Sequence, residues 1–497
     1  MSTRPRSDDL RRIGPAAVAA LLVAAALGRA LAGCAPDSDG GMAARVDAVF
    51  ADYAGADGPG CSVGVIRDGR LVHAVGYGSA NLEYGIPNGP GTIYRIASVS
   101  KQFTAGAIAL LALRGEVDLD APVQRYIPEF PDYTDPPTVR HLVHHTSGVR
   151  DYLGLFYLAG NRSEDFITNE DILDAINRQR ELNFPPGSQY LYSNSGYVLL
   201  GEIVARVTGQ SLRKFAKAEF FDPLGMPHTH FHDDHNEVVP NRATGYSPTD
   251  DGFRINMTTL DVVGDGGIYT SVEEWTTWDR NLTEGTVGGL EWVALMHERT
   301  VLTSGDTIPY AFGLSHGEDR GLATVGHSGS WVGYRTAMTR YPDTGYSFVA
   351  LCNRSRIDPA ALIRSTAEIY LEDAMDPPEE VAEGEAEEEQ TTEEIAGGED
   401  AAEAPSDHDI PNRTRYAGSF YSPELDATYR IVAEGAAGLT LHLGRWDPVA
   451  LVAESDWQLT TEDGPTLRFS ELVDDRYEAM IVDAGRVRNL RFARTEE

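Results

Sequence analysis

The stretch RIASVSKQFTA, residues 95–105, places Ser98 and Lys101 three positions apart. Lysine occurs at only three positions in this chain, among 41 basic residues. A desolvated amine can give up its proton, whereas a guanidinium in practice cannot, so a lysine at this place indicates proton chemistry. The spacing alone is a weak signal, because Ser211 and Lys214 have it too.

The surroundings of Ser98 and Lys101 distinguish this pair. The segment TIYRIASVSKQFTAGAIALLAL, residues 92–113, predicts an extended stretch that runs into a helix near Ser98. Side chains three apart share a helix face, so the hydroxyl and the amine can meet. The helix is apolar on nearly all faces and is therefore expected to be buried. Burial would lower the lysine pKa and let a neutral amine take the serine proton.

The start of that helix offers free backbone N–H groups, which suit a developing oxyanion. The competing pair lacks this setting. SLRKFAKAEFF, residues 211–221, predicts a surface helix on which the amines of Lys214 and Lys217 stay hydrated.

Length and charge limit the function classes. A chain of 497 residues is long enough for two or three domains with a substantial core. Its formal net charge of -35 argues against a nucleic-acid partner, since binding to phosphates needs a basic face.

The N-terminus predicts export. Arginines precede an apolar run at residues 16–27, and LAGC follows at residues 31–34. This is the order of a signal peptide, here residues 1–33, and the run is too short to span a bilayer as a mature helix. LAGC resembles a bacterial lipobox, which implies that Cys34 is acylated and anchors the protein to a membrane of the cell envelope. Ordinary secretion, with Cys34 as a bystander, is the alternative.

Residues 34–41 then read as a tether, and residues 42–373 mix strands with helices. GCSVGVIRDGRLVHAVGYG predicts a hairpin with its turn at Asp68 and Gly69. Two further strands, in YRTAMTRYPDTGYSFVALCN, and a helix end the region. Strands at both ends with helices between them predict an α+β domain whose terminal segments share one sheet.

Cys61 and Cys352 both lie in strand-like apolar runs. Two buried thiols are the simplest interpretation. Export would permit a disulfide if the two strands are neighbours.

The composition changes after this region. Residues 374–410 are dense in acid and poor in apolar residues, which predicts a disordered linker. Residues 411–497 contain short alternating runs such as LTLHL, which predict a small antiparallel barrel or sandwich.

Two motifs follow Ser98 in a fixed order. They are YSN at Tyr192–Asn194 and HSG at His327–Gly329, and HHTSGVRDY, PLGMPHTHF and GDGGIYTS stand between them or before them. With these motifs, residues 42–373 resemble the serine β-lactamase and penicillin-binding-protein superfamily. The similar branch is the class C β-lactamase-like one, with D-aminopeptidases, DD-peptidases and family VIII esterases.

The resemblance implies a fold and a set of roles. The fold is an antiparallel sheet flanked by helices, with an all-helical region and here a lipocalin-like C-terminal barrel. Ser98 would be the nucleophile, and Lys101 and Tyr192 would share its proton. The backbone N–H groups of Ser98 and Ser330 would form the oxyanion hole. The residues implied in substrate binding are Asn194, His327, Ser328, Gly329 and Ser330.

The third motif departs from the pattern of many β-lactamases and DD-peptidases, which have lysine where His327 stands. A charged hydrogen bond to a substrate carboxylate contributes about 1.5 to 3 kcal/mol, and a histidine mostly neutral near pH 7 loses much of it. This disfavours efficient penicillin hydrolysis and leaves esters, amides and D-amino-acid peptides open.

Three other patterns have competing interpretations. GHSGS, residues 326–330, nearly matches the nucleophile elbow G-x-S-x-G, but serine replaces its last glycine. HTHFHDDH, residues 228–235, could bind zinc, and structural hydrogen bonding is the favoured alternative. His141, His144 and His145 are also interpreted as structural.

The sequence therefore predicts an exported serine hydrolase that forms an acyl-enzyme on Ser98 with an ester, an amide or a D-amino-acid peptide. It needs no cofactor or metal, and its partners are a small-molecule or peptide substrate and a membrane through the lipid anchor. One alternative is a non-catalytic protein of this fold that binds peptidoglycan or peptides. Another is a true β-lactamase or DD-carboxypeptidase. No feature predicts an oligomeric state.

Overall fold

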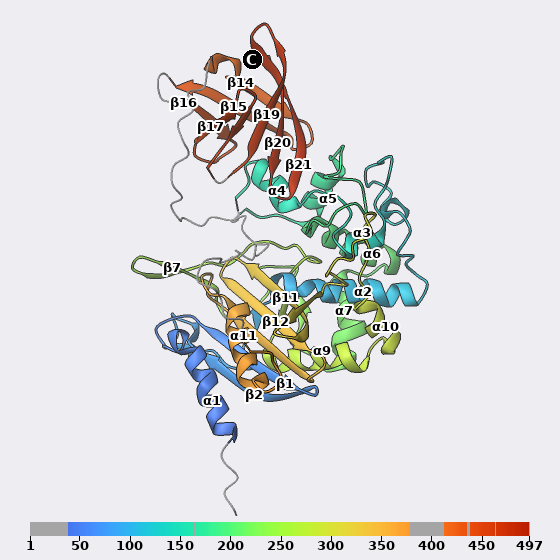
Figure 1. The fold of residues 1–497 in the computed structure, drawn as a ribbon, viewed down its shortest axis with the longest axis vertical. Coiled ribbons are helices and arrows are strands. Elements are labelled where there is room, and N and C mark those ends of the chain that lie inside the picture. Colours follow the sequence, from blue (N-terminus) through green and yellow to red (C-terminus); the bar gives the residue numbers. More distant parts are fainter. Residues whose placement is uncertain (1–37, 163–164, 378–411, 435–437, 463, 497) are drawn as a thin grey trace, which may run out of the picture.

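The computed structural model describes residues 38–497 except 163–164, 378–411, 435–437, 463 and 497 (Figure 1). The predicted signal peptide, Cys34 and nearly all of the predicted acidic linker lie outside the described residues. Helix α1, Ser38–Val49, begins inside the predicted tether, so that prediction is wrong for residues 38–41. The linker also begins later than predicted, because Met375 is buried and the Asp376 N–H donates to Arg320 O at 2.8 Å.

One antiparallel sheet of six strands organises the larger part, in the order β10-β11-β12-β13-β1-β2. The strands are β1 (Cys61–Arg67), β2 (Arg70–Tyr77), β10 (Ser315–Asp319), β11 (Leu322–Trp331), β12 (Tyr334–Tyr341) and β13 (Tyr346–Cys352). Because β1 pairs with β13, segments from both ends of the region share one sheet, as predicted. The predicted turn between β1 and β2 is also confirmed: Asp68 and Gly69 have φ of 50° and 70°, the positive values of a type I′ turn.

Helices cover both faces of this sheet. Helix α11 (Pro359–Leu371) packs with α1 against one face through a cluster that includes Val46, Val63, Ala337 and Ile363. Helix α9 (Val272–Glu284) contacts β1, β2 and β13 from the other side.

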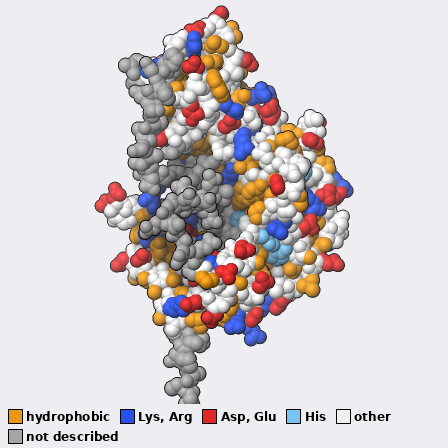
Figure 2. Space-filling view, viewed as in Figure 1, with side chains coloured by type: hydrophobic (Ala, Val, Ile, Leu, Met, Phe, Trp, Pro, Cys, Tyr) orange, Lys and Arg blue, Asp and Glu red, His pale blue; other side chains and the backbone are white. Residues whose placement is uncertain are grey.

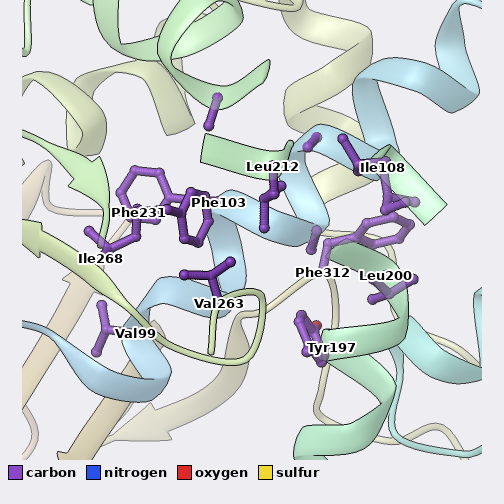
Figure 3. Close-up of a cluster of buried hydrophobic side chains, with 14 of the residues drawn as sticks. Val99, Phe103, Ile108, Tyr197, Leu200, Leu212, Phe231, Val263, Ile268 and Phe312 are labelled. Atoms are coloured by element: carbon purple, nitrogen blue, oxygen red, sulfur yellow. The ribbon is translucent and has the colours of Figure 1, made fainter. Parts of the chain in front are cut away.

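Helix α2 (Lys101–Leu113) lies in the larger core between the sheet and the helical region. Its residues from Lys101 to Leu111 are all buried, which confirms the prediction from its apolar faces. It packs against α6 (Asn194–Thr208) and α10 (Gly289–Met296). Figure 3 shows Phe103 and Ile108 of α2 in this core. The other helices of this region are α3 (Val139–Val143), α4 (Tyr152–Leu158), α5 (Asn169–Asn177), α7 (Leu212–Ala216) and α8 (Asp222–Leu224).

Three small sheets connect the layers. A three-stranded sheet has the order β5-β9-β6, and two hairpins pair β3 with β4 and β7 with β8. The strands are β3 (Ser79–Asn81), β4 (Ile86–Pro87), β5 (Tyr94–Arg95), β6 (His230–Phe231), β7 (Tyr246–Thr249), β8 (Gly252–Ile255) and β9 (Ile268–Thr270). The predicted α+β architecture is confirmed.

The C-terminal part is a closed barrel of eight strands, which confirms the predicted barrel. The strands are β14 (Gly418–Ser422), β15 (Ala427–Glu434), β16 (Gly438–Leu443), β17 (Val449–Ser455), β18 (Gln458–Thr460), β19 (Thr466–Val473), β20 (Arg476–Ala484) and β21 (Val487–Arg494). Its core includes Leu155 and Leu158 of α4, so the helix contributes side chains to the barrel. Figure 1 shows α4 next to the barrel.

A buried ion pair joins the barrel to the rest of the chain. Arg150 Nη1 lies 2.6 Å from Glu424 Oε2, and the two side chains are 0% and 3% exposed. The same guanidinium donates to the backbone oxygens of Arg488 and Asn489, each at 3.0 Å. Since a buried charge is stable only with well-placed partners, these bonds fix where the barrel sits.

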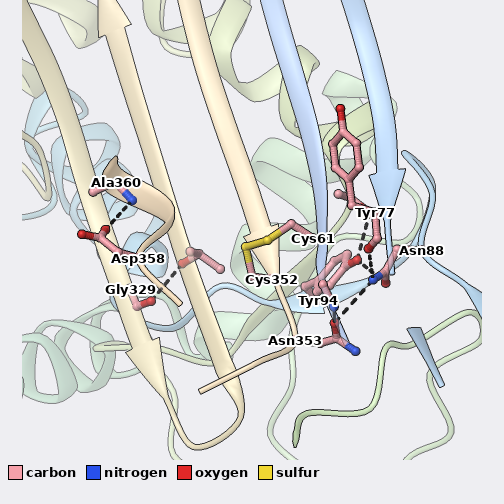
Figure 4. Close-up of a disulfide and its surroundings, with 12 residues drawn as sticks. Cys61, Tyr77, Asn88, Tyr94, Gly329, Cys352, Asn353, Asp358 and Ala360 are labelled. Atoms are coloured by element: carbon pink, nitrogen blue, oxygen red, sulfur yellow. Dashed lines mark hydrogen bonds between the residues drawn. A yellow bond between two sulfur atoms is a disulfide. The ribbon is translucent and has the colours of Figure 1, made fainter. Parts of the chain in front are cut away.

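Cys61 and Cys352 face each other across β1 and β13 and form a disulfide (Figure 4). The bond closes a loop with a sequence separation of 291 residues. It ties the first strand of the sheet to the last one in sequence. Among the described residues, no helix is long and apolar enough to cross a membrane.

We predict that Cys61→Ala/Cys352→Ala lowers the free energy of unfolding by about 2 to 5 kcal/mol, because the disulfide limits the unfolded chain. Thermal unfolding of both proteins, with and without reductant, measures this. Reductant should lower the melting temperature of the wild type and leave that of the double variant unchanged. Equal melting temperatures of the oxidised wild type and the variant would contradict the prediction.

Candidate active site

Ser98 lies in a short 3₁₀ turn, Ala97–Ser100, between β5 and the start of α2. Ala97 has φ of 48°, a left-handed conformation that is costly for a residue with a Cβ. Such strain is retained where the surrounding structure enforces it, and it is concentrated at functional sites. The strained residue directly precedes the predicted nucleophile.

Lys101 opens α2 and its side chain is fully buried. Its Nζ donates to Asn194 Oδ1 at 2.7 Å, to Asp265 O at 2.8 Å and to Ser98 Oγ at 3.3 Å. An ammonium has three donors for these three acceptors. A neutral amine keeps two donors for Asn194 and Asp265 and turns its lone pair to the Ser98 hydroxyl. The geometry thus suits both protonation states of a proton carrier.

Ser211 and Lys214, which share the spacing, have other roles. Ser211 is the N-cap of α7, and its hydroxyl accepts from the Lys214 backbone N–H at 3.4 Å. Lys214 is exposed, as predicted. The serine–lysine spacing alone therefore does not identify chemistry.

Tyr192 lies beside Lys101, with its ring centroid 4.6 Å from Nζ. The His145 ring packs on Tyr192 at 4.1 Å, and His145 Nδ1 accepts from the Ser193 N–H at 3.1 Å. Burial, with Lys101 nearby, holds the pKa of His145 well below its usual value. A neutral His145 thus supports the segment that carries Tyr192 and Asn194.

His141 and His144 also make hydrogen bonds within the protein, in line with their interpretation as structural residues. His141 belongs to the capping box of α3, where its Nδ1 accepts from the Thr138 N–H at 3.2 Å. His144 Nδ1 lies 3.2 Å from Tyr310 O.

His327 uses both ring nitrogens within the protein. Nδ1 lies 2.6 Å from Ser328 O, which can only accept, so Nδ1 carries the proton. Nε2 then accepts from the Tyr310 hydroxyl at 3.0 Å. Burial and the nearby Lys101 lower the pKa of His327 to about 4. A neutral His327 with both ring nitrogens engaged in this way is poorly placed to bind a carboxylate.

The HSG segment lies on a free strand edge, as predicted. Strand β10 pairs with β11 only as far as Gly326, so His327–Trp331 have a partner strand, β12, on one side. Ser328 is exposed within this strand, which excludes the strand-to-helix turn of a nucleophile elbow. Ser330 pairs with Arg335 of β12.

Gly329 lets β11 lie close to the backbone of the nucleophile. A Cβ added there would lie 2.4 Å from Ile96 O, 2.6 Å from Thr336 Oγ1 and 3.1 Å from Ser98 N. The Ser98 N–H is therefore next to the β11 edge that also carries Ser330. The oxyanion hole formed by the Ser98 and Ser330 N–H groups stays a prediction.

Sequence reasoning missed several residues of the site. Asp265 contributes its backbone oxygen to Lys101, and its carboxylate accepts from the Tyr152 hydroxyl at 3.0 Å. Asp151 Oδ2 accepts from the Asn194 N–H at 2.7 Å, and Tyr310 contacts His327. Asp151 and Asp265 stand in the motifs HHTSGVRDY and GDGG, which offered a signal. Tyr310 had none.

The barrel also reaches the site through the turn between β20 and β21. The guanidinium of Arg486 lies 5.4 Å from the Tyr192 ring centroid, and its Nη1 lies 3.7 Å from Asp151 Oδ2. The turn is held by Asn183, whose side chain donates to Arg486 O at 2.9 Å and accepts from the Arg488 N–H at 2.8 Å. Arg486 of the C-terminal barrel thus lies beside Tyr192 and Asp151 of the candidate site.

The histidine-rich segment 228–235 is tied down by hydrogen bonds. His228 Nδ1 lies 2.6 Å from Glu274 Oε1, and His235 Nδ1 lies 2.9 Å from Asp261 Oδ2. His230 and His232 approach each other at 3.3 Å. These contacts fit the structural interpretation. The ligand atoms of His230, His232 and Glu237 also lie within 4.8 Å of one another, so the arrangement is compatible with the zinc alternative as well.

Comparisons with known proteins agree with this geometry. Residues 46–371 match the family described as Beta-lactamase. The chain belongs to the beta-lactamase family. Within the family it is 30% identical over 298 residues to a D-aminopeptidase of Gluconobacter oxydans, which covers 60% of this chain and 56% of that protein. It is also 30% identical to penicillin-binding protein 4* of Bacillus subtilis over 63% of this chain and 73% of that protein. The chain thus spans little more than half the length of the D-aminopeptidase.

Solved structures of the beta-lactamase family share the fold. The octameric penicillin-binding protein homologue from Pyrococcus abyssi has a TM-score of 0.59 at 23% identity and covers 91% of this chain. The match includes 99% of that chain. A D-amino acid amidase from Ochrobactrum anthropi has a TM-score of 0.55 at 22% identity over 66% of this chain and 97% of its own.

We predict that Gly329→Ala slows the labelling of Ser98 by a fluorophosphonate about 100-fold or more. The new methyl group must displace β11 from the Ser98 N–H, and loss of one oxyanion donor has an effect of this size. Gly55→Ala is the control, because a Cβ there meets nothing within 4 Å. Labelling of Gly329→Ala at the wild-type rate would show that this strand does not shape the site.

We predict that Arg486→Ala slows the same labelling about two- to thirtyfold, the effect of losing a cation–π contact of about 0.5 to 2 kcal/mol. Arg491→Ala on β21 is the matched control, since that side chain is 67% exposed and pairs with Glu181 away from Tyr192. Equal rates for the two variants would mean that the barrel does not act on the site through Arg486.

Proposed function

We propose that this chain is a serine hydrolase that forms an acyl-enzyme on Ser98 and acts on amides or peptides. The observation that carries the proposal is the position of Lys101. Its Nζ is hydrogen-bonded to Ser98 Oγ while Asn194 and Asp265 hold it from two other segments. A serine next to a buried, fixed amine is the arrangement of an activated nucleophile.

The reaction follows from these positions. Neutral Lys101 takes the proton of Ser98, and Oγ attacks the substrate carbonyl carbon. The backbone N–H groups of Ser98 and Ser330 stabilise the oxyanion. The proton then passes from Lys101, or through the nearby Tyr192 hydroxyl, to the leaving amine, and an ester remains on Ser98. Water attacks this ester, its proton returns through the same groups, and the acid product leaves with Ser98 regenerated.

The proposed substrate class follows from the absence of a positive charge on His327. A neutral histidine with both ring nitrogens engaged gives no cation for a carboxylate at that position, which disfavours penicillins as good substrates. The similarity to a D-aminopeptidase supports amides and peptides with D-amino acids. Esters remain substrates that the same acyl-enzyme can handle. On the face shown in Figure 2, basic and acidic side chains are mixed.

We also propose that the protein is exported and anchored to a membrane of the cell envelope by lipid on Cys34. The leader with its LAGC end motivates this proposal. The disulfide between Cys61 and Cys352 supports it, because disulfides persist in oxidising compartments outside the cytosol. Metabolic labelling with a palmitate analogue tests it: label should appear in the wild type and be lost in Cys34→Ser.

The catalytic roles have a matched test within the chain. Ser98→Ala should abolish fluorophosphonate labelling, and Lys101→Arg should slow it by about 10² to 10⁴, the usual contribution of a general base. Ser211→Ala and Lys214→Arg alter the pair with the same spacing and should label like the wild type. A folded wild type that labels no more than Ser98→Ala would overturn the enzyme proposal and favour a non-catalytic binding protein.

A substrate panel then separates the subclasses. D-amino-acid amides, p-nitrophenyl esters and nitrocefin are compared by kcat/KM, with Ser98→Ala as the blank. We expect amides or esters to be turned over much faster than nitrocefin. Fast nitrocefin turnover would refute the argument from His327 and favour a true β-lactamase.

A further inference from the structure

A second concave site lies close to Ser98 in sequence, on the small sheet β5-β9-β6. Arg95 of β5 pairs with Tyr269 of β9, so their side chains share one face of this sheet. The Tyr269 ring packs against His232 at 4.7 Å. With His235 and Arg242, these side chains line a pocket of about 120 Å³. We refer to it as the Arg95–Arg242 pocket.

The two arginines of this pocket lack carboxylate partners. Arg95 is 3% exposed, yet its guanidinium makes no hydrogen bond or ion pair with any residue that the structure describes, and its Nε is buried without an acceptor. Arg242 is half-buried and makes none with the described residues either. A guanidinium stays charged in a protein, and a buried charge without a counter-ion is strongly unfavourable.

The carboxylates around the pocket have other partners. Asp261 accepts from the backbone N–H of His235 at 2.6 Å and from its ring at 2.9 Å. Asp265 accepts from Tyr152, and Glu237 is held by Arg213 through two bonds of 2.7 and 2.8 Å. These acids therefore do not neutralise the arginines by direct contact.

His232 adds a further polar group without adding charge. It is 2% exposed and its Nε2 has no acceptor or donor among the described residues. Burial and the neighbouring His230, Arg95 and Arg242 lower its pKa to about 4, so it is neutral near pH 7. The pocket thus combines two cations with a buried imidazole.

We propose that the Arg95–Arg242 pocket binds a small oxyanion, either a carboxylate or a phosphate group. Its volume of about 120 Å³ is well above the roughly 10 to 15 Å³ that a single water molecule requires on a comparable measure. Sites for whole small molecules are larger, about 300 to 1,000 Å³. The pocket therefore fits one charged group and not an entire ligand.

Two sources can supply such a group. Arg95 lies three residues before Ser98, and Arg242 is bridged to Ile93 on the same segment. The anion is therefore either the carboxylate of a bound substrate or a free ion that completes the fold beside the site. The first source rests on the proposed hydrolase function, and the second does not.

Binding is tested without turnover, on Ser98→Ala protein, so that its outcome is independent of catalysis. Phosphate and acetate are titrated at constant ionic strength against chloride, with melting temperature as the readout. Both oxyanions should raise the melting temperature in a saturable way, as a ligand of the folded state does. Arg242→Gln should weaken the apparent Kd at least tenfold, and Arg242→Lys should lie between.

The matched control is Arg254→Gln, which removes an exposed arginine on β8 that has no ion pair among the described residues. It should bind phosphate like the parent protein. The proposal is overturned if phosphate stabilises no more than chloride, or if Arg242→Gln responds like Arg254→Gln. In either case the pocket would be a hydrated structural site.

Kinetics with active enzyme distinguish the two sources. Matched substrates with a free carboxylate and with the corresponding amide are compared. If the substrate supplies the anion, phosphate competes with the carboxylate substrate alone, and Arg242→Gln raises KM for that substrate alone. If the anion is free, phosphate and the variant affect both substrates equally while phosphate still raises the melting temperature.

Discussion

The site depends on the burial of one amine. Lys101 is enclosed at the start of α2, and its amine donates hydrogen bonds to Ser98, Asn194 and Asp265, which lie in different segments of the chain. An amine in this position would be costly to bury without partners, so each acceptor must be in place. Asp151 fixes the segment of Asn194, and Tyr152 holds the carboxylate of Asp265. The helices and loops around the site therefore act together to hold Lys101 Nζ in place.

Strand β11 of the six-stranded sheet forms the other side of the site, and it is positioned in a different way. There the constraint is the absence of a side chain, because Gly329 allows β11 to lie against the backbone of Ser98. Ala97, with its strained conformation, lies between Ile96 and Ser98, the two residues whose backbone atoms are next to Gly329. Hydrogen bonds position Lys101, the proposed base, and steric contact positions the backbone of Ser98, a proposed oxyanion donor.

Much of this arrangement could be predicted from the sequence. The apolar pattern of α2, the Asp68 and Gly69 turn and the alternating C-terminal strands gave the architecture, since these signals are local. The ordered motifs gave Ser98, Lys101, Tyr192 and His327. Asp265 acts through its backbone oxygen, and its side chain gives no hint of this. Tyr310 and Arg486 reach the site through tertiary packing, which no local pattern encodes. The start of α1 was missed because Gly40 and Gly41 suggest a flexible segment.

The packing of α4 has a consequence for how the molecule holds together. Leu155 and Leu158 leave the helical region and fill part of the barrel core, while Arg150 is neutralised by Glu424 of the barrel. Separating the barrel from the helical region would expose apolar surface on both. It would also leave Arg150 and Glu424 each without its ion-pair partner. The C-terminal barrel therefore shares its core with the helical region, and Arg486 links its β20–β21 turn to Tyr192.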